Sequence, residues 1–141
     1  MQEKSKPVDN LRADAEKIIT RAIAAVLPDA AVERALKGKT FLGRVSLVAA
    51  GKAAWQMAHA ARACLQDNFC GGVVVTKYGH VKGEIANVAC FEGGHPVPDE
   101  NSLRGTDAAL ALTEDLTESD TVVFLLSGGG SALFEKPLLP L

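Results

Sequence analysis

The chain has 141 residues, of which 48% are hydrophobic and 23% are charged, with a formal net charge of −2. These values are ordinary for one globular domain with an apolar core, and they give no electrostatic reason to expect nucleic acid or an anionic membrane as a partner. No segment approaches the ~18 apolar residues of a membrane span, and residues 1–7 lack the apolar core of a signal peptide. We therefore expect a cytoplasmic protein without a nucleic-acid or membrane partner.

The first 38 residues predict two amphipathic helices. Apolar residues recur at helical spacing from Leu11 to Val26, with Asp9 as a candidate N-cap, and Pro28 ends this helix. Residues 29–36 then predict a shorter helix that ends at Gly38. We expect this helical pair to pack on the part of the chain that follows.

From residue 45 onward, strand patterns alternate with helical patterns. Apolar runs predict strands at residues 45–50, 72–76, 87–91 and 121–126, and helical patterns occupy residues 53–66 and 99–115. Asp99 is expected to cap the second of these helices, with Leu103 and Leu110 facing inward. This order predicts a three-layer, Rossmann-like α/β fold, in which a mostly parallel sheet carries helices on both faces and follows an N-terminal helical pair. The run at 121–126 is continuously apolar, which predicts a strand buried on both faces.

The segment after the last predicted strand, Ser127-Gly-Gly-Gly-Ser131, is the most informative in the chain. Glycines let backbone N–H groups approach an anion that a Cβ would push away, and residues 132–134 begin a helix whose positive dipole end adds to the attraction. A tight turn alone needs one glycine. Three in a row favour an anion-binding loop that consists of Ser127, Gly128, Gly129, Gly130 and Ser131.

The segments that follow parallel strands gather along one edge of a sheet, where open α/β folds bind ligands. Lys52 is the leading catalytic candidate at that edge, because a cation at a helix N-terminus is disfavoured unless an anion offsets both charges. Lys77, His80 and His95 are further candidates for holding a phosphorylated or carboxylated ligand, although each also fits a structural role. His59, near Trp55, is assigned to packing or to the surface.

Several common site motifs are absent. The segment around Lys52 is not a Walker A loop, because Ser46 and Ala53 stand where that motif has its first glycine and its final hydroxyl residue. No G-x-G-x-x-G or H-E-x-x-H motif is present. The three cysteines (Cys64, Cys70 and Cys90) form no C-x-x-C pair, which favours reduced, buried thiols and predicts no metal site.

Four segments together resemble the two-domain glycerate 2-kinases, whose C-terminal part is called MOFRL. They match in order and approximate spacing, and the resemblance extends from the first helix to the end of the chain. The segments are Ala50-Gly-Lys-Ala-Ala-Trp55, Val75-Thr-Lys-Tyr-Gly-His80, Gly93-Gly-His-Pro-Val-Pro-Asp99 and Leu126-Ser-Gly-Gly-Gly-Ser-Ala-Leu133.

This resemblance implies transfer of the γ-phosphoryl group of ATP to the 2-hydroxyl of D-glycerate, with Mg²⁺, in a cleft between two domains. Lys52 matches the catalytic lysine of the family, and Ser127–Ser131 matches its glycine-rich ligand loop. The family also needs a C-terminal domain, which supplies an arginine, and the resemblance leads us to expect that domain outside these 141 residues. Residues 1–141 are therefore expected to form an incomplete N-terminal domain, a fragment that is inactive without its C-terminal partner domain.

Three other interpretations stay open. Relatives of this family often carry the label hydroxypyruvate reductase, although that activity needs a dinucleotide site and no such motif is visible. A non-catalytic module that binds a small phosphorylated ligand through the glycine-rich loop is a second alternative. The third is a truncated product without function.

Overall fold

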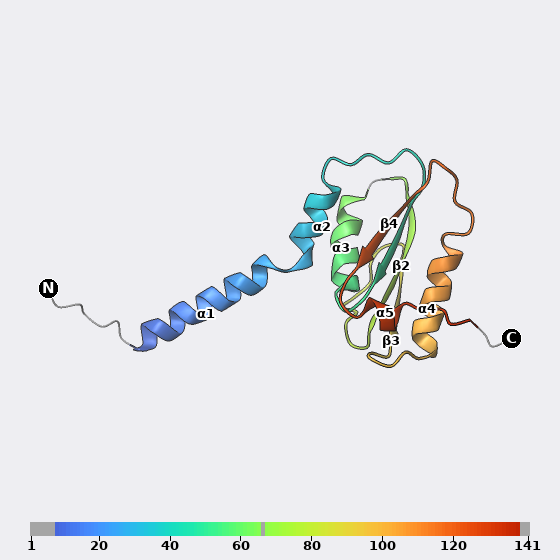
Figure 1. Cartoon of the computed structure of the whole chain (residues 1–141). Coiled ribbons are helices and arrows are strands. Elements are labelled where there is room, and N and C mark those ends of the chain that lie inside the picture. Colours follow the sequence, from blue (N-terminus) through green and yellow to red (C-terminus); the bar gives the residue numbers. More distant parts are fainter. Residues whose placement is uncertain (1–7, 66, 139–141) are drawn as a thin grey trace.

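A computed structural model describes residues 8–65 and 67–138 (Figure 1). The elements, in chain order, are α1 (Val8–Ala25), α2 (Pro28–Leu36), β1 (Val45–Ala50), α3 (Ala54–Cys64), β2 (Phe69–Lys77), β3 (Val88–Gly93), α4 (Glu100–Ala111), β4 (Thr121–Leu126) and α5 (Gly130–Leu133).

The four strands form one parallel sheet in the order β3-β2-β1-β4. Helices α2 and α3 cover one face, and α4 and α5 lie on the other (Figure 1). The predicted three-layer α/β fold is therefore confirmed. All four strands run in the same direction, so their carboxyl ends and the loops that follow lie at one edge of the sheet.

Two apolar layers hold the sheet between its helices, because successive side chains of a strand point to opposite faces. Leu47 and Val74 pack with the alanines of α3 on one side. Val48, Val75 and Ala109 of α4 belong to the second layer. The side chains of β1 are buried along its whole length, as expected for the central strand of a parallel sheet.

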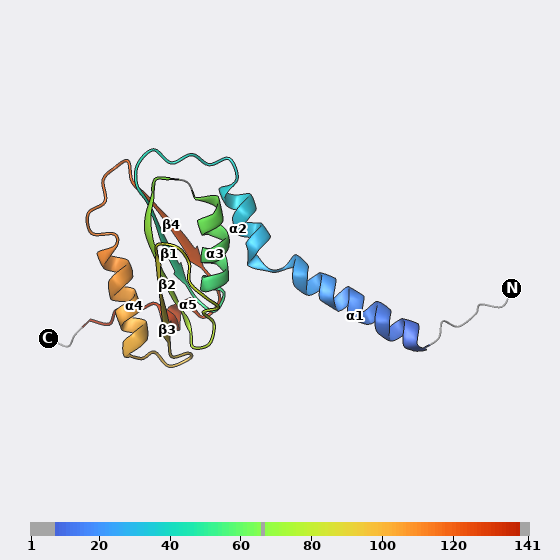
Figure 2. The ribbon, with the colours of Figure 1, turned by 180° about the vertical axis from the view of Figure 1, so that it is seen from behind.

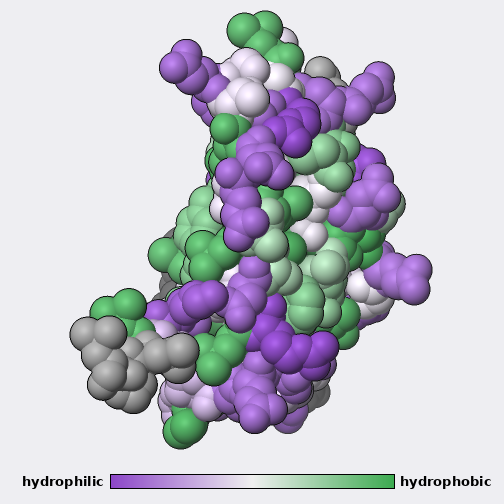
Figure 3. All heavy atoms as spheres, turned by 90° about the vertical axis from the view of Figure 1, so that its right-hand side faces the viewer, coloured by the Kyte–Doolittle hydropathy of each residue, from purple (hydrophilic) through white to green (hydrophobic). Residues whose placement is uncertain are grey.

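Helix α4 is capped as predicted, but one of its leucines does not pack as predicted. Asp99 is its N-cap, as predicted, and forms a capping box with Ser102. Leu110 does not face inward: 43% of its surface is exposed, because the buried face of α4 consists of the smaller residues Ser102, Gly105, Thr106 and Ala109. Figure 3 shows the right-hand side of the molecule in Figure 1, where α4 lies. On this side, apolar side chains reach the surface between polar ones.

The prediction that β4 is buried on both faces is wrong. Val123 and Leu125 pack under the α3 layer, but Phe124 and Leu126 on the other face are 49% and 62% exposed. β4 is an edge strand of this sheet, and α4 lies over β2 and β3 instead. Phe134, just after α5, gives partial cover through an edge-on ring contact with Phe124.

The expected packing of the N-terminal helical pair holds for α2 and not for α1. Val32 of α2 is buried, and α2 packs along α3. α1 projects away from the sheet and its helices, so the apolar stripe that includes Ile18, Ile19 and Ile23 is more than half exposed (Figures 1 and 2). Asp9 lies inside α1, not before it. Among the described residues, no helix has the length and apolar character needed to cross a bilayer.

Candidate active site

The loops that follow β1 and β4 are joined by a set of short hydrogen bonds. The Ser127 amide donates to the carbonyl of Ala50 at 2.9 Å, and the Lys52 amide donates to the carbonyl of Gly128 at 2.9 Å. The Ser127 hydroxyl donates to the Ala50 carbonyl at 3.3 Å and accepts from the Ala53 amide at 3.0 Å. The Ser127 hydroxyl thus fastens the glycine-rich loop to the start of α3. Its role as an anion ligand stays a prediction.

Gly51 makes this close approach possible. Its φ is +113°, a conformation that side chains resist, and a Cβ there would overlap the carbonyl oxygen and the hydroxyl of Ser127. Its carbonyl accepts a hydrogen bond from the buried hydroxyl of Thr76 at 2.9 Å. A glycine at residue 51 therefore places Lys52 directly beside the glycine-rich loop.

Lys52 and His95 converge on Gly129. A Cβ built on Gly129 would lie 2.7 Å from His95 Nε2 and 3.3 Å from Lys52 Cε, and the φ of Gly129 is +88°. The amides of Gly128 and Gly129 have no hydrogen-bond acceptor within the described part of the chain. An ammonium group, an imidazole ring and free backbone donors thus meet at one point, a combination suited to an anion. Gly130 begins α5, and Ser131 is exposed.

The loop after β2 is held from two sides. His80 Nδ1 lies 2.7 Å from the Lys52 carbonyl oxygen, so this ring nitrogen carries the proton. The Val81 amide donates to Glu92 Oε1 at 2.7 Å. This bond, with further ones from the amides of Gly79 and His80, holds the pKa of the Glu92 carboxyl below its ordinary value.

Two residues near this loop were not predicted from the sequence. No motif marks Glu92, and only the folded loop shows which amide it accepts from. Lys82 lines a pocket beside Lys52 and His80, and no motif in the sequence marks it. The candidate Lys77 is half-buried at the end of β2, paired in register with Gly93.

Asp99 ties the loop after β2 to the start of α4. Its Oδ2 accepts from the Tyr78 hydroxyl at 2.8 Å, and the Asn101 side-chain amide donates to the same hydroxyl at 2.7 Å. The Tyr78 bond, with backbone bonds from Ser102 and Gly94, lowers the pKa of the Asp99 carboxyl. His59 stacks on Trp55, in agreement with its predicted packing or surface role.

The described residues do not form a metal centre. None of their His, Cys, Asp and Glu side chains gathers into a group of three that could hold an ion. Mg²⁺ is commonly held by one or two carboxylates together with substrate phosphates, so it does not need such a group. The cysteines are free thiols, but the prediction that they are buried is wrong: Cys70 is exposed, and Cys64 and Cys90 are half-buried. Partial burial and the nearby Glu92 charge raise the pKa of Cys90.

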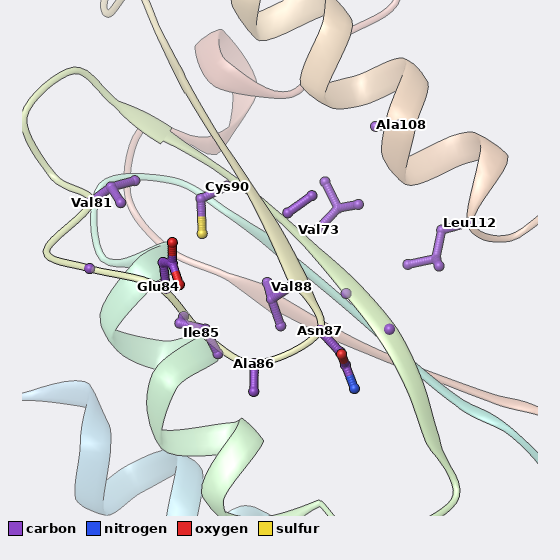
Figure 4. A pocket seen from close by; sticks show the side chains of 14 residues that line it. Val73, Val81, Glu84, Ile85, Ala86, Asn87, Val88, Cys90, Ala108 and Leu112 are labelled. Atoms are coloured by element: carbon purple, nitrogen blue, oxygen red, sulfur yellow. The ribbon is translucent and has the colours of Figure 1, made fainter.

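A larger cavity, of about 1260 Å³, lies along the edge strand β3 (Figure 4). Its walls come mainly from apolar side chains of β2, β3 and α4, including Val73, Val88 and Leu112, with Glu84 as its acidic group. Neither Lys52 nor Gly129 lines this cavity. We therefore place the site at the carboxyl ends of the strands, where the polar groups converge.

Comparison with known proteins identifies the family. Residues 14–141 match the family described as a domain of unknown function, DUF4147. The chain belongs to the DUF4147 family. It is 53% identical over 130 residues to the D-glycerate 2-kinase of Thermotoga maritima, an alignment that covers 92% of the chain and 31% of that relative. The crystal structure of glycerate kinase from Thermotoga maritima superposes with a TM-score of 0.83 at 52% identity, over 92% of this chain and 31% of that one.

The DUF4147 chain is also similar to a relative with another name. A protein of Agrobacterium vitis, provisionally named hydroxypyruvate reductase, is 39% identical over 121 residues, or 86% of the chain and 27% of the relative. The chain thus spans about a third of the length of the curated relatives that it matches.

Proposed function

We propose that this chain is the N-terminal part of a glycerate 2-kinase, which transfers the γ-phosphoryl group of ATP to the 2-hydroxyl of D-glycerate. One observation carries the proposal: Lys52 and His95 converge on Gly129, beside amides with no acceptor among the described residues. The similarity to the Thermotoga maritima D-glycerate 2-kinase supports the choice of reaction.

The arrangement suits phosphoryl transfer, which depends on positioning and on stabilising charge more than on covalent chemistry. The Lys52 ammonium group offsets negative charge that develops on the transferred phosphoryl oxygens. The amides of Gly128 and Gly129, which have no acceptor among the described residues, donate to an anionic group of the bound substrate. We assign proton exchange with the acceptor hydroxyl to His95, whose Nε2 lies beside Gly129. Mg²⁺ is assigned no ligand in this segment.

The remaining parts of the enzyme belong to the rest of a longer protein. We propose that residues 1–141 form the first part of its N-terminal α/β domain and are inactive alone, and that a C-terminal domain completes the cleft. The exposed face of β4 at Phe124 and Leu126 supports further packing against this sheet. The three free thiols fit a reducing compartment such as the cytoplasm.

Lys52→Ala tests the proposal in the protein that joins this segment to its C-terminal part. We expect kcat for phosphorylation of D-glycerate to fall by at least ~100-fold, equivalent to about 2.7 kcal/mol, because the variant loses charge stabilisation of the transition state. Thermal stability should barely change. Lys39→Ala, in the exposed loop before β1, is the matched control and should retain full activity. A near-normal kcat in the Lys52 variant would reduce this residue to an ordinary surface lysine.

Hydroxypyruvate reductase is the second candidate, favoured by the name of the Agrobacterium vitis relative. Incubation of the same protein with hydroxypyruvate and NADH separates the two activities. If the protein oxidised NADH and did not phosphorylate glycerate, the proposed kinase function would be wrong and the reductase function would take its place.

A further inference from the structure

A pocket of about 320 Å³ lies between the start of α3 and the loop that follows β2. This volume is at the lower end of the range for small-molecule sites. The side chains that give the pocket its chemical character are Lys52, Trp55, Gln56, His80 and Lys82.

Three hydrogen bonds fix the wall of this pocket. The Trp55 indole N–H donates to the Gly83 carbonyl at 2.9 Å, and His80 Nδ1 donates to the Lys52 carbonyl at 2.7 Å. The Val81 amide is held on Glu92 at 2.7 Å. The loop is thus bound to α3 and to β3 at the same time. A wall that is ordered before a ligand arrives lowers the entropy cost of binding.

The pocket is electropositive. Lys52 and Lys82 border it, and no carboxylate is found among the described residues that line it. Two acidic groups that bond to the pocket lining or to the loop beside it have these partners: Glu92 accepts from the Val81 amide, and Asp29 accepts from the Gln56 side chain. Because His80 Nδ1 donates to a carbonyl, its Nε2 is left for a ligand.

Lys52 borders two binding regions. It lines this pocket, and its Cε also approaches Gly129, where His95 and the free amides lie. A phosphoryl group transferred from one region to the other would therefore pass Lys52. The pocket adds Lys82 to the shared Lys52 and the His80 imidazole, and two ammonium groups match the several charges of a polyphosphate. The region at Gly129 has Lys52 as its one ammonium group, with an imidazole and backbone amides, which suit a single carboxylate.

We propose that this pocket binds the phosphates of the nucleotide that are not transferred, and that the glycine-rich loop with His95 receives the hydroxy-acid acceptor. This assignment rests on the proposed kinase function and divides its site into a donor side and an acceptor side. Lys82 is a binding residue of the donor side.

Inorganic pyrophosphate is the probe for this assignment. Trp55 is the sole tryptophan and lines the pocket, so its fluorescence reports occupancy, and equilibrium dialysis of radiolabelled pyrophosphate measures the same Kd independently. We expect saturable binding that Lys82→Ala weakens by about tenfold, the effect of losing one charged hydrogen bond. Lys82→Arg should keep most of the affinity, and the Lys39→Ala control should leave it unchanged. ATP should displace pyrophosphate, and D-glycerate should not.

Three results would overturn the assignment. The first is that dialysis at millimolar pyrophosphate shows no saturable binding. The second is that Lys82→Ala and Lys39→Ala weaken pyrophosphate binding equally, and the third is that D-glycerate displaces pyrophosphate. Phosphorylation of glycerate by the longer protein is measured separately. If that activity is absent, the proposed function fails, while the titration still decides whether the pocket holds a polyphosphate.

Discussion

Replacement of Gly129 by alanine tests the point at which the candidate site converges. The new Cβ would lie 2.7 Å from His95 Nε2 and 2.9 Å from its Cδ2. Ordinary carbon contacts begin near 3.5 Å, so the imidazole ring must move by roughly 1 Å. A displacement of that size at a reacting centre costs about 100-fold in rate.

The same substitution also strains the backbone. Gly129 has a φ of +88°, and an alanine in the left-handed region costs roughly 1–2 kcal/mol. For a domain of this length, such a loss lowers the melting temperature by roughly 3–8 °C. Gly129→Ala should therefore reduce both stability and kcat, with the larger fractional effect on kcat.

Gly128→Ala is the matched control for stability, because a Cβ at residue 128 meets no protein atom within 4 Å. Thermal unfolding by circular dichroism and the rate of ADP release with D-glycerate, both measured on the longer protein, compare the two variants. If Gly129→Ala left both the melting temperature and kcat unchanged, the convergence of Lys52 and His95 on this residue would be refuted. A lower melting temperature with unchanged kcat would show that Gly129 serves only the turn.

Three further predictions concern the fold. Gly51→Ala should lower the free energy of unfolding by about 2–5 kcal/mol in denaturant titrations, because its Cβ would overlap Ser127 at a φ of +113°, and a loss below about 1 kcal/mol would contradict this packing. Asp120 forms an ion pair with Arg44 at 2.9 Å, which holds the pKa of the Asp120 carboxyl well below the ordinary 3.8. The stabilisation from this carboxylate is present above pH 3.8 and is lost as the pH falls below it, so Asp120→Asn should make the free energy of unfolding fall less steeply below pH ~4. Parallel curves of unfolding free energy against pH for the two proteins would rule this out. Ile19→Gln on exposed α1 should change the stability of this chain by less than about 0.5 kcal/mol, whereas Val32→Ala on buried α2 should cost more than about 1 kcal/mol, and equal losses would show that α1 packs on the sheet in solution.

Local patterns in the sequence determined the fold class. Alternation of apolar runs with helical spacing after residue 45 is sufficient to predict a parallel sheet between two helical layers, because each element must bury its apolar face against another. Asp99 was recognisable as an N-cap from its position before the helix, and its capping bonds depend only on residues within the next turn. The glycines after β4 likewise marked a loop in which backbone donors are accessible.

Neighbours in space decided the rest. A continuous apolar run such as Thr121–Leu126 predicts a strand with apolar side chains on both faces. Whether that strand is central or at an edge of the sheet depends on which elements lie beside it. The exposed stripe of α1 has the same cause, since amphipathic spacing predicts a helix and not its partner.

The site shows this limit most clearly. His95 and Lys52 meet at Gly129 only because β3, β1 and β4 end at the same edge of the sheet, and no local pattern encodes their separation. Glu92 and Lys82 carry no motif, and their roles follow from a loop held by hydrogen bonds to α3 and β3. Periodicity and turn chemistry are local properties of the chain, whereas the distances that make a binding site are set by the packing of segments far apart in sequence.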